Sequence, residues 1–151
     1  MSEKPFPLEL LGVLFSRTIV QAIHGYDPAA PNEQLTPVNQ VKAQKDANEE
    51  DIYWCLMHTV FNKERSVAGP YLVDVECLVK FRLVSPLSED RAKTGVLITG
   101  HNIAYGAIRE AVSWITSRHV HGPLVLGISV LNLVTPAGEK PDAEQPPLVG
   151  P

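Results

Sequence analysis

YLVDVECLVKFRL, the stretch from Tyr71 to Leu83, alternates between two kinds of side chain along its whole length. One set of alternate positions is apolar throughout: Tyr71, Val73, Val75, Cys77, Val79, Phe81 and Leu83. The other set is more polar: Leu72, Asp74, Glu76, Leu78, Lys80 and Arg82. A period of two is the period of a β-strand, and one dry face opposite a wetter one is typical of an antiparallel sheet. The stretch therefore predicts a long antiparallel strand.

The preceding segment Asp51–Asn62, DIYWCLMHTVFN, is also rich in strand-forming residues, but it is apolar on both faces. His58 interrupts one of the two apolar rows, and a single histidine in such a row is usually a core residue with satisfied hydrogen bonds. A strand of this kind needs cover on both sides. Because one small domain has difficulty supplying two covers, we expect one to come from another subunit or a bound chain.

Two further segments complete a sheet of four antiparallel strands. The segment from Leu10 to His24 alternates imperfectly, since Arg17 and Gln21 break its apolar row. A bulge near Ser16–Arg17 or a partly exposed edge would explain this break. Residues Val38 to Asp46 alternate weakly and predict a polar edge strand.

Between Gly100 and Arg118 the period changes from two to 3.6, which predicts a helix with Thr99 as its N-cap. Its apolar residues cover an arc of roughly 200°, wider than the stripe of a helix with one buried side, so we expect the helix between two layers. These residues are Ile103, Ala104, Tyr105, Ala107, Ile108, Ala111, Val112, Trp114 and Ile115. After Gly122–Pro123, the short apolar segment LVLGISVLNL has a period of two.

The predicted fold class is therefore α+β: a four-stranded antiparallel sheet followed by a long helix packed on it. The chain of 151 residues is long enough for one domain, which we assign to residues 1–134. Residues 135–151 are polar and rich in proline, and we expect them to form a disordered tail because they cannot supply a core.

Composition and charge narrow the classes of function. The formal net charge is -4 and Lys and Arg are not clustered, so nucleic acid is not an expected partner. The apolar runs are far shorter than the roughly 20 residues that span a bilayer, and MSEKPFP lacks the apolar core of a secretory signal. We expect a cytoplasmic protein without membrane insertion, in which Cys55 and Cys77 are buried, reduced thiols.

The sequence predicts no enzyme, cofactor or metal site. His119 and His121 lie close together, but they sit at a helix end without further ligands, where the helix dipole favours a cationic histidine. Asp74 and Glu76 share the wetter strand face with Lys80, as expected for a solvated surface. A small-molecule site or an enzyme stays open as an alternative, built from these carboxylates and the histidines His24, His58, His101, His119 and His121.

The helix and the segment after it match the motif of one known family. The family carries R-E-x-[IV]-[ST]-x-[hydrophobic]-x-S-R, then a short loop and L-x-L. The matching residues are Arg109, Glu110, Val112, Ser113, Ile115, Ser117, Arg118, Leu124 and Leu126. On this motif and on the order of the elements, the chain resembles the SecB protein-export chaperones, most strongly over residues 102–131.

This resemblance implies an ATP-independent holdase, a chaperone without enzymatic activity that keeps unfolded preproteins from aggregating. It also implies a homotetramer, a dimer of dimers, with the long helices at the interface. The residues that we expect at this interface are Ala104, Ile108, Val112 and Ile115. Those that we expect to bind clients are Phe15, Trp54, Met57, Leu78, Leu124, Leu126 and Ile128.

In the SecB family, acidic residues of the first and last strands contact the SecA translocase. Leu72 and Asp74 match the last-strand contact, and we expect them to dock the translocase. Thr18 and Ala22 stand where the first-strand acids belong, so the resemblance implies weakened SecA binding. Where the family continues into a second helix that covers its groove, this sequence soon becomes proline-rich, so we expect that covering helix to be shortened or absent. The alternative to export clients is therefore a dedicated partner, as in a toxin–antitoxin system or a phage-encoded protein.

Overall fold

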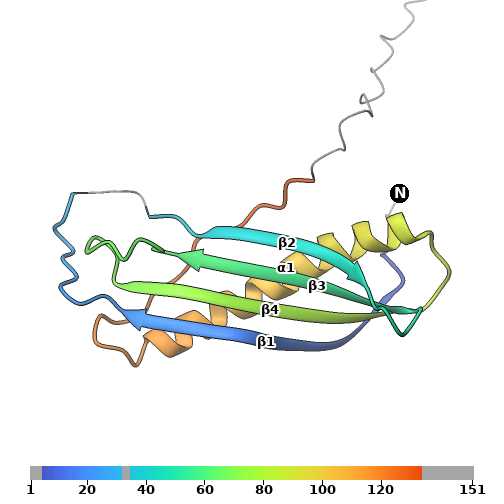
Figure 1. The fold of residues 1–151 in the computed structure, drawn as a ribbon, viewed down its shortest axis with the longest axis horizontal. Helices are drawn as coiled ribbons and strands as arrows, with labels where there is room; N and C mark the ends of the chain where they lie inside the picture. Colours follow the sequence, from blue (N-terminus) through green and yellow to red (C-terminus); the bar gives the residue numbers. More distant parts are fainter. Residues whose placement is uncertain (1–4, 32–34, 134–151) are drawn as a thin grey trace, which may run out of the picture.

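The computed structural model describes residues 5–31 and 35–133, which form one sheet and one helix (Figure 1). The strands are β1 (Leu8–Ala22), β2 (Val38–Lys45), β3 (Ile52–Phe61) and β4 (Tyr71–Leu83), and the helix α1 spans Glu89–Thr116. A four-stranded antiparallel sheet followed by one long helix confirms the predicted α+β fold class. The predicted tail at residues 135–151 lies outside the described residues.

The sheet has the strand order β1-β4-β3-β2, and all neighbouring strands are antiparallel. The two segments with the clearest strand patterns, β3 and β4, occupy the centre, and β1 and β2 are the edges. The pairing of β1 with β4 slips between Phe15 and Arg17, which confirms the predicted bulge near Ser16–Arg17. A second slip, which the sequence did not predict, lies between Leu10 and Gly12.

The helix begins well before the predicted N-cap Thr99, so that prediction was wrong. The actual cap is Ser88, whose side chain accepts a hydrogen bond from the backbone N–H of Arg91, and Glu89 and Asp90 follow in the first turn. Carboxylates at this place interact favourably with the positive end of the helix dipole. No helix among the described residues is long and apolar enough to cross a membrane.

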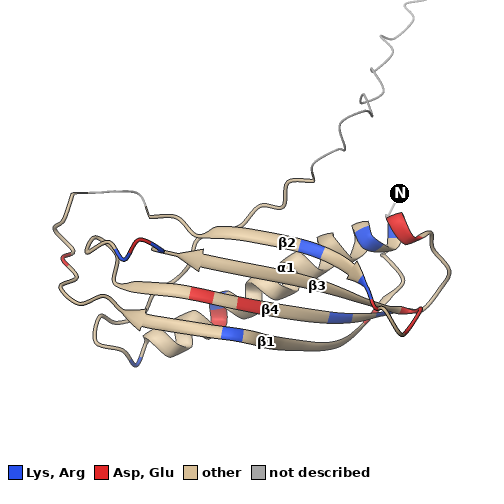
Figure 2. Ribbon diagram, viewed as in Figure 1, with Lys and Arg blue, Asp and Glu red and all other residues tan. Residues whose placement is uncertain are grey.

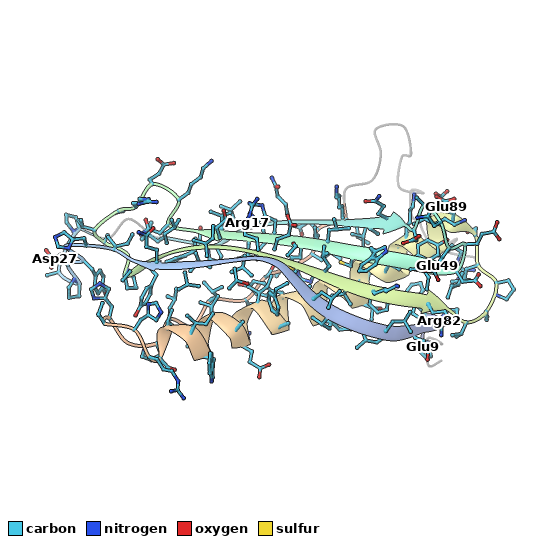
Figure 3. The ribbon with its side chains drawn as sticks, turned by 60° about the horizontal axis from the view of Figure 1, so that its bottom comes forward. Glu9, Arg17, Asp27, Glu49, Arg82 and Glu89 are labelled. Atoms are coloured by element: carbon cyan, nitrogen blue, oxygen red, sulfur yellow. The ribbon has the colours of Figure 1, made fainter. Side chains whose placement is uncertain are left out.

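The core lies between α1 and one face of the sheet, which we call the inner face (Figure 3). The helix buries a line of residues at a spacing of four: Ala92, Val96, Gly100, Ala104, Ile108, Val112 and Thr116. Gly100 lets the helix come close to β3, because a Cβ atom at this residue would lie 2.4 Å from the Cβ atom of Cys55. Within this chain the helix thus packs on one layer, and Trp114 on its other side is 63% exposed.

Beyond α1, the chain turns at Gly122, which has a positive φ of 77°, and runs back beside the helix without forming a strand. Two side chains of α1 hold this returning segment. Tyr105 donates its hydroxyl hydrogen to the carbonyl of Gly127 at 2.5 Å, and Arg109 Nε donates to the carbonyl of Leu126 at 2.9 Å. The period of two seen in the sequence therefore reflects one side of an extended segment that is bound to the helix.

Candidate functional site

The outer face of the sheet, opposite the inner face, has no helix or strand packed on it among the described residues. Alternate residues of the three strands β2, β3 and β4 form it in matching rows: Val38, Gln40, Lys42, Gln44, Trp54, Leu56, His58, Val60, Leu72, Asp74, Glu76, Leu78 and Lys80. The apolar members of β3 and β4 are half-buried by their neighbours but have no second layer above them. One face of the doubly apolar strand β3 is therefore left without cover, as the sequence predicts.

The edge strand β1 adds a second apolar surface. Its 15 residues pair with β4 alone, so the backbone groups of its far edge have no strand partner among the described residues. Five large apolar side chains of this strand are exposed: Leu10, Leu11, Leu14, Phe15 and Ile19. A long apolar edge of this kind promotes pairing with another chain.

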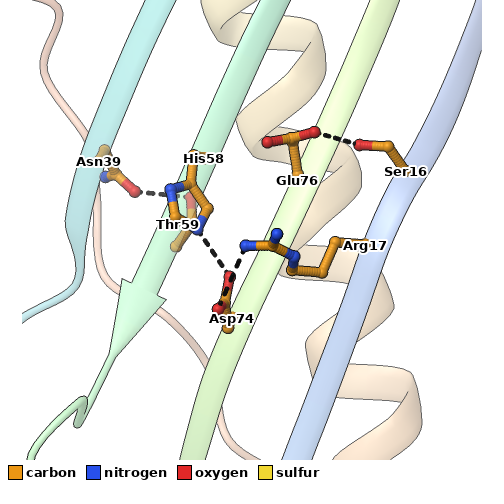
Figure 4. Close-up of polar contacts among 7 residues, drawn as sticks. All are labelled: Ser16, Arg17, Asn39, His58, Thr59, Asp74 and Glu76. Atoms are coloured by element: carbon orange, nitrogen blue, oxygen red, sulfur yellow. Dashed lines mark hydrogen bonds and ion pairs between the residues drawn. The ribbon is translucent and has the colours of Figure 1, made fainter.

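Asp74 lies at the centre of a polar network on the outer face (Figure 4). Its Oδ1 atom is 2.6 Å from Nε2 of His58, and its Oδ2 atom is 3.6 Å from Nη1 of Arg17. Next to it, Ser16 donates a hydrogen bond to Glu76 at 2.5 Å. Both oxygen atoms of Asp74 are thus engaged, and His58 lies on the open face rather than in the core.

Thr18 and Ala22, the positions that match the family's first-strand acids, do not share this face. They are in register with Val75 and Tyr71, which are buried on the inner face. The bulge at Ser16 changes the alternation of β1, so Arg17 stands beside Glu76 on the outer face instead. The predicted docking residues Leu72 and Asp74 are consequently in register with Gln21 and Ile19 of β1, and not with Thr18 or Ala22. Arg17 of the same strand contacts Asp74.

Three adjoining hollows follow the outer face along β3, and we call them the β3 trough. The first, about 290 Å³, is lined by Trp54, Leu56 and Leu78 among others. The second, about 340 Å³, shares Leu56 with the first and reaches His58. The third, about 580 Å³, shares His58 and extends over Val60 to the loops at that end of the sheet. The trough is apolar at Trp54 and Leu56 and polar at His58.

Hydrogen bonding and charge fix the end of the β3 trough at Trp54. The indole N–H of Trp54 donates to Oδ2 of Asp46 at 2.9 Å, and this bond is the main reason why the pKa of that carboxyl is lowered. The Nζ atom of Lys80 lies 5.3 Å from the centre of the Trp54 ring. Trp54 is therefore held with its ring as a fixed wall of the hollow.

The predicted client-binding residues fall into two groups. Five of them are at least partly accessible to solvent: Phe15, Trp54, Leu78, Leu124 and Ile128. Of these, Trp54 and Leu78 line the β3 trough, and the other three lie apart from it. Met57 and Leu126 are buried, at 0% and 2% exposure, and belong to the core of the chain itself. The sequence analysis did not single out Leu56 or the exposed β1 residues Leu10, Leu11 and Leu14.

Three of the four predicted interface residues also lie in the chain's own core. Ala104, Ile108 and Val112 are fully buried between α1 and the sheet, so a second subunit would not reach their side chains. Ile115 is partly exposed. The wide apolar arc of the helix has a different physical reason, since its buried line shifts around the helix from Ala92 to Thr116 as it follows the sheet.

The side chains of His119, His121, Cys55 and Cys77 pack or form hydrogen bonds within the fold. The ring of His121 bonds the carbonyl of Ile23 through Nε2 at 3.0 Å, while His119 lies edge-on to the ring of Tyr71. No group of three His, Cys, Asp or Glu residues suited to a metal ion occurs in residues 5–31 and 35–133. Burial raises the pKa of the thiols of Cys55 and Cys77 to about 12 and about 11, so both are protonated at neutral pH.

Comparison with known proteins gives no match to a family model or to a curated protein. Among solved structures, the chain is similar to a Mycobacterium tuberculosis SecB-like chaperone in complex with a ChAD peptide from the HigA1 antitoxin. The TM-score is 0.60 at 18% identity, over 82% of this chain and 88% of that chain. It is also similar to a Streptococcus agalactiae protein of unknown function, with a TM-score of 0.55 at 8% identity, over 80% and 97% of the two chains. At these identities the likeness concerns the fold alone, and this chain has a fold similar to that of the SecB-like chaperone.

Proposed function

We propose that this protein is a non-enzymatic, ATP-independent holdase that binds unfolded or partner polypeptides on the outer face of its sheet. The observation that carries the proposal is the uncovered apolar surface of the β3 trough, within a fold shared with a SecB-like chaperone. A stable domain normally buries a strand such as β3 on both faces, and apolar surface left open marks an interaction site.

The mechanism needs no chemistry. Client side chains that enter the β3 trough lose contact with water, which contributes about 25 cal/mol for each Å² of apolar surface that is removed. Each site binds weakly, because the hollows are open to solvent and partly polar. Several sites on one assembly would hold a client far more tightly, since the second contact is made within the same complex.

Assembly of several copies is part of the proposal. The exposed edge of β1 is suited to pair with β1 of a second copy, and the free side of α1 around Trp114 to meet further subunits. Pairing through the β1 edge would form a dimer, and contact through the free side of α1 would join two dimers into a homotetramer. The two buried cysteines without a disulfide are in keeping with a reducing cytoplasm.

The client is better explained as a dedicated partner than as an export preprotein handed to SecA. Arg17 and His58 both contact Asp74, the carboxylate that would dock a translocase, and so occupy its two oxygen atoms. Thr18 and Ala22 cannot supply acids to the same face, since they lie on the inner side of β1. The related Mycobacterium tuberculosis protein holds a peptide of an antitoxin, and a partner of that kind is our first choice here.

The test is suppression of aggregation. A chemically unfolded client is diluted into buffer without ATP, with and without the protein, and light scattering is followed. We expect suppression by the natural chain and its loss in Leu56→Gln/Leu78→Gln, which makes the β3 trough polar. The matched control is Val125→Gln/Val130→Gln, which removes two exposed apolar side chains elsewhere. Equal suppression by both variants would exclude the outer face as the site.

A further inference from the structure

We infer that the β3 trough, taken as the binding site of the proposed function, selects extended polypeptide segments that carry an apolar residue at every second position and acidic residues between them. Such a client complements two features of the trough: its period along β3 and the lysines on its two walls. The inference rests on the proposed function, and it adds the class of polypeptide that is bound.

The period follows from the shared residues of the hollows. Leu56 belongs to the first and second hollows, and His58 belongs to the second and third. Leu56 and His58 are two residues apart on one strand, a distance of about 6.6 Å. In an extended peptide, side chains on one side recur at the same distance. A client lying along β3 can therefore place alternate side chains in successive hollows.

The charge preference follows from Lys42 and Lys80. Lys42 of β2 is in register with Leu56 and lines the second hollow. Lys80 of β4 is in register with Trp54, and its Nζ atom lies 5.3 Å from the centre of that ring. The two lysines thus come from the strands on either side of β3, at the apolar end of the trough. Neither lysine forms an ion pair with any of the described residues. Figure 2 shows Lys or Arg residues on β2 and on β4, the strands to either side of β3.

The acidic residues around the trough are already engaged. Asp74 contacts His58 and Arg17, Glu76 accepts the hydrogen bond of Ser16, and Asp46 accepts that of Trp54. At the far end, Lys63 and Glu64 line the third hollow together and offset each other. Lys42, Lys80 and Lys45, which also lines the first hollow, form no ion pair among the described residues, and Lys80 contacts only the ring of Trp54. This surface therefore attracts carboxylates although the whole chain has a net charge of -4.

The experiment measures binding of labelled synthetic peptides by fluorescence anisotropy, using the full chain. The first peptide has leucine at every second position and aspartate between the leucines. The second has lysine in place of aspartate, and the third has the residues of the first with all leucines adjacent. We expect the first peptide to bind about tenfold more tightly than the second at low salt, as two weak surface ion pairs would give, and the preference to shrink as salt is added.

Charge reversal locates the preference. Lys42→Glu/Lys80→Glu should abolish or invert it, and the milder Lys42→Gln/Lys80→Gln should remove it without adding repulsion. Arg91→Glu/Arg118→Glu changes the net charge of the chain equally, but on α1 and just after it, and should leave the preference unchanged. A thermal transition like that of the natural chain shows that each variant is folded.

The outcomes separate the inference from the proposed function. Equal binding of the aspartate and lysine peptides, together with suppression of client aggregation, overturns the charge preference and leaves the holdase standing. Binding of the third peptide as tight as that of the first overturns the period of two. Failure of all three peptides, together with failure to suppress aggregation, overturns both proposals.

Discussion

The two faces of the sheet are built from the same strands but are covered in opposite ways. On the inner face, α1 packs so closely that Gly100 leaves no room for a Cβ atom above Cys55. On the outer face, large apolar residues such as Leu56 and Leu78 border hollows that are open to solvent. Inner-face side chains thus stabilise the fold, whereas outer-face side chains are free to bind another chain. Substitutions on the two faces should separate stability from binding.

The largest difference is expected for a charge placed on each face. Ile108→Asp puts a carboxylate in the fully buried core, and it should cost about 4 kcal/mol of folding free energy or unfold the protein. Leu78→Asp on the outer face should cost less than about 1 kcal/mol, because water reaches the site. Urea unfolding followed by circular dichroism measures both. Similar losses in the two variants would mean that the outer face is covered as well.

The edge strands offer the next contrast. Leu14→Lys/Ile19→Lys on β1 removes exposed apolar surface and adds repulsion between copies, and it should weaken self-association by about 3 kcal/mol, roughly a hundredfold. Gln40→Lys/Gln44→Lys makes the matched change on the polar edge strand β2 and should leave the assembly intact. Native mass spectrometry at several concentrations distinguishes them. If the assembly dissociates only in the β2 variant, the wrong edge has been assigned.

Alanine substitutions at two glycines of α1 should change the folding stability by smaller amounts and in opposite directions. Gly100→Ala should destabilise the protein by about 2 kcal/mol, because the new Cβ atom meets Cys55 and the helix must move away from β3. Gly106→Ala meets nothing within 4 Å and should stabilise the helix by up to about 1 kcal/mol. Differential scanning calorimetry of both variants gives the two signs. A stabilising Gly100→Ala would show that the inner face is looser than described.

The smallest effect, taken at pH 9, concerns the buried thiols. Their pKa values are raised in the folded chain, to about 12 for Cys55 and about 11 for Cys77, from a usual value of 9.0. The unfolded chain therefore loses these protons first. Stability that is complete well below pH 9 falls as the pH rises through 9 towards the folded pKa values of about 11 and about 12. At pH 9 the loss is about 1 kcal/mol for the two thiols together. Cys55→Ala/Cys77→Ala should show a shallower fall, and an identical fall would assign it to other groups.

Much of the fold could be predicted because alternation is a local property. The bounds of β4 agree with its pattern at both ends, and the bulge at Ser16 follows from the position of Arg17 in an apolar row. The start of α1 was missed although Ser88, Glu89 and Asp90 form an ordinary N-terminal signal, because the apolar period is clearest further along the chain.

The candidate site could be predicted only in part. The sequence shows that β3 is apolar on both faces, but it does not show which face α1 covers, so Met57 and Trp54 look equally suited to bind clients. The sequence also does not show on which side of β1 Thr18 lies, because the bulge between Phe15 and Arg17 changes the alternation after it. The contacts of Asp74 with Arg17 and His58 depend on the order of the strands, which brings β1 and β3 to either side of β4.

The most direct test of outer-face binding uses the two tryptophans of the chain, which lie on different surfaces. Trp54 borders the β3 trough, whereas Trp114 is exposed on the free side of α1. Trp114→Phe leaves Trp54 as the single reporter, and Trp54→Phe leaves Trp114. Each variant is titrated with an unfolded client that lacks tryptophan, and emission is recorded. We predict a blue shift and reduced quenching by iodide for Trp54, with no change for Trp114. A response of Trp114 alone would contradict binding on the outer face.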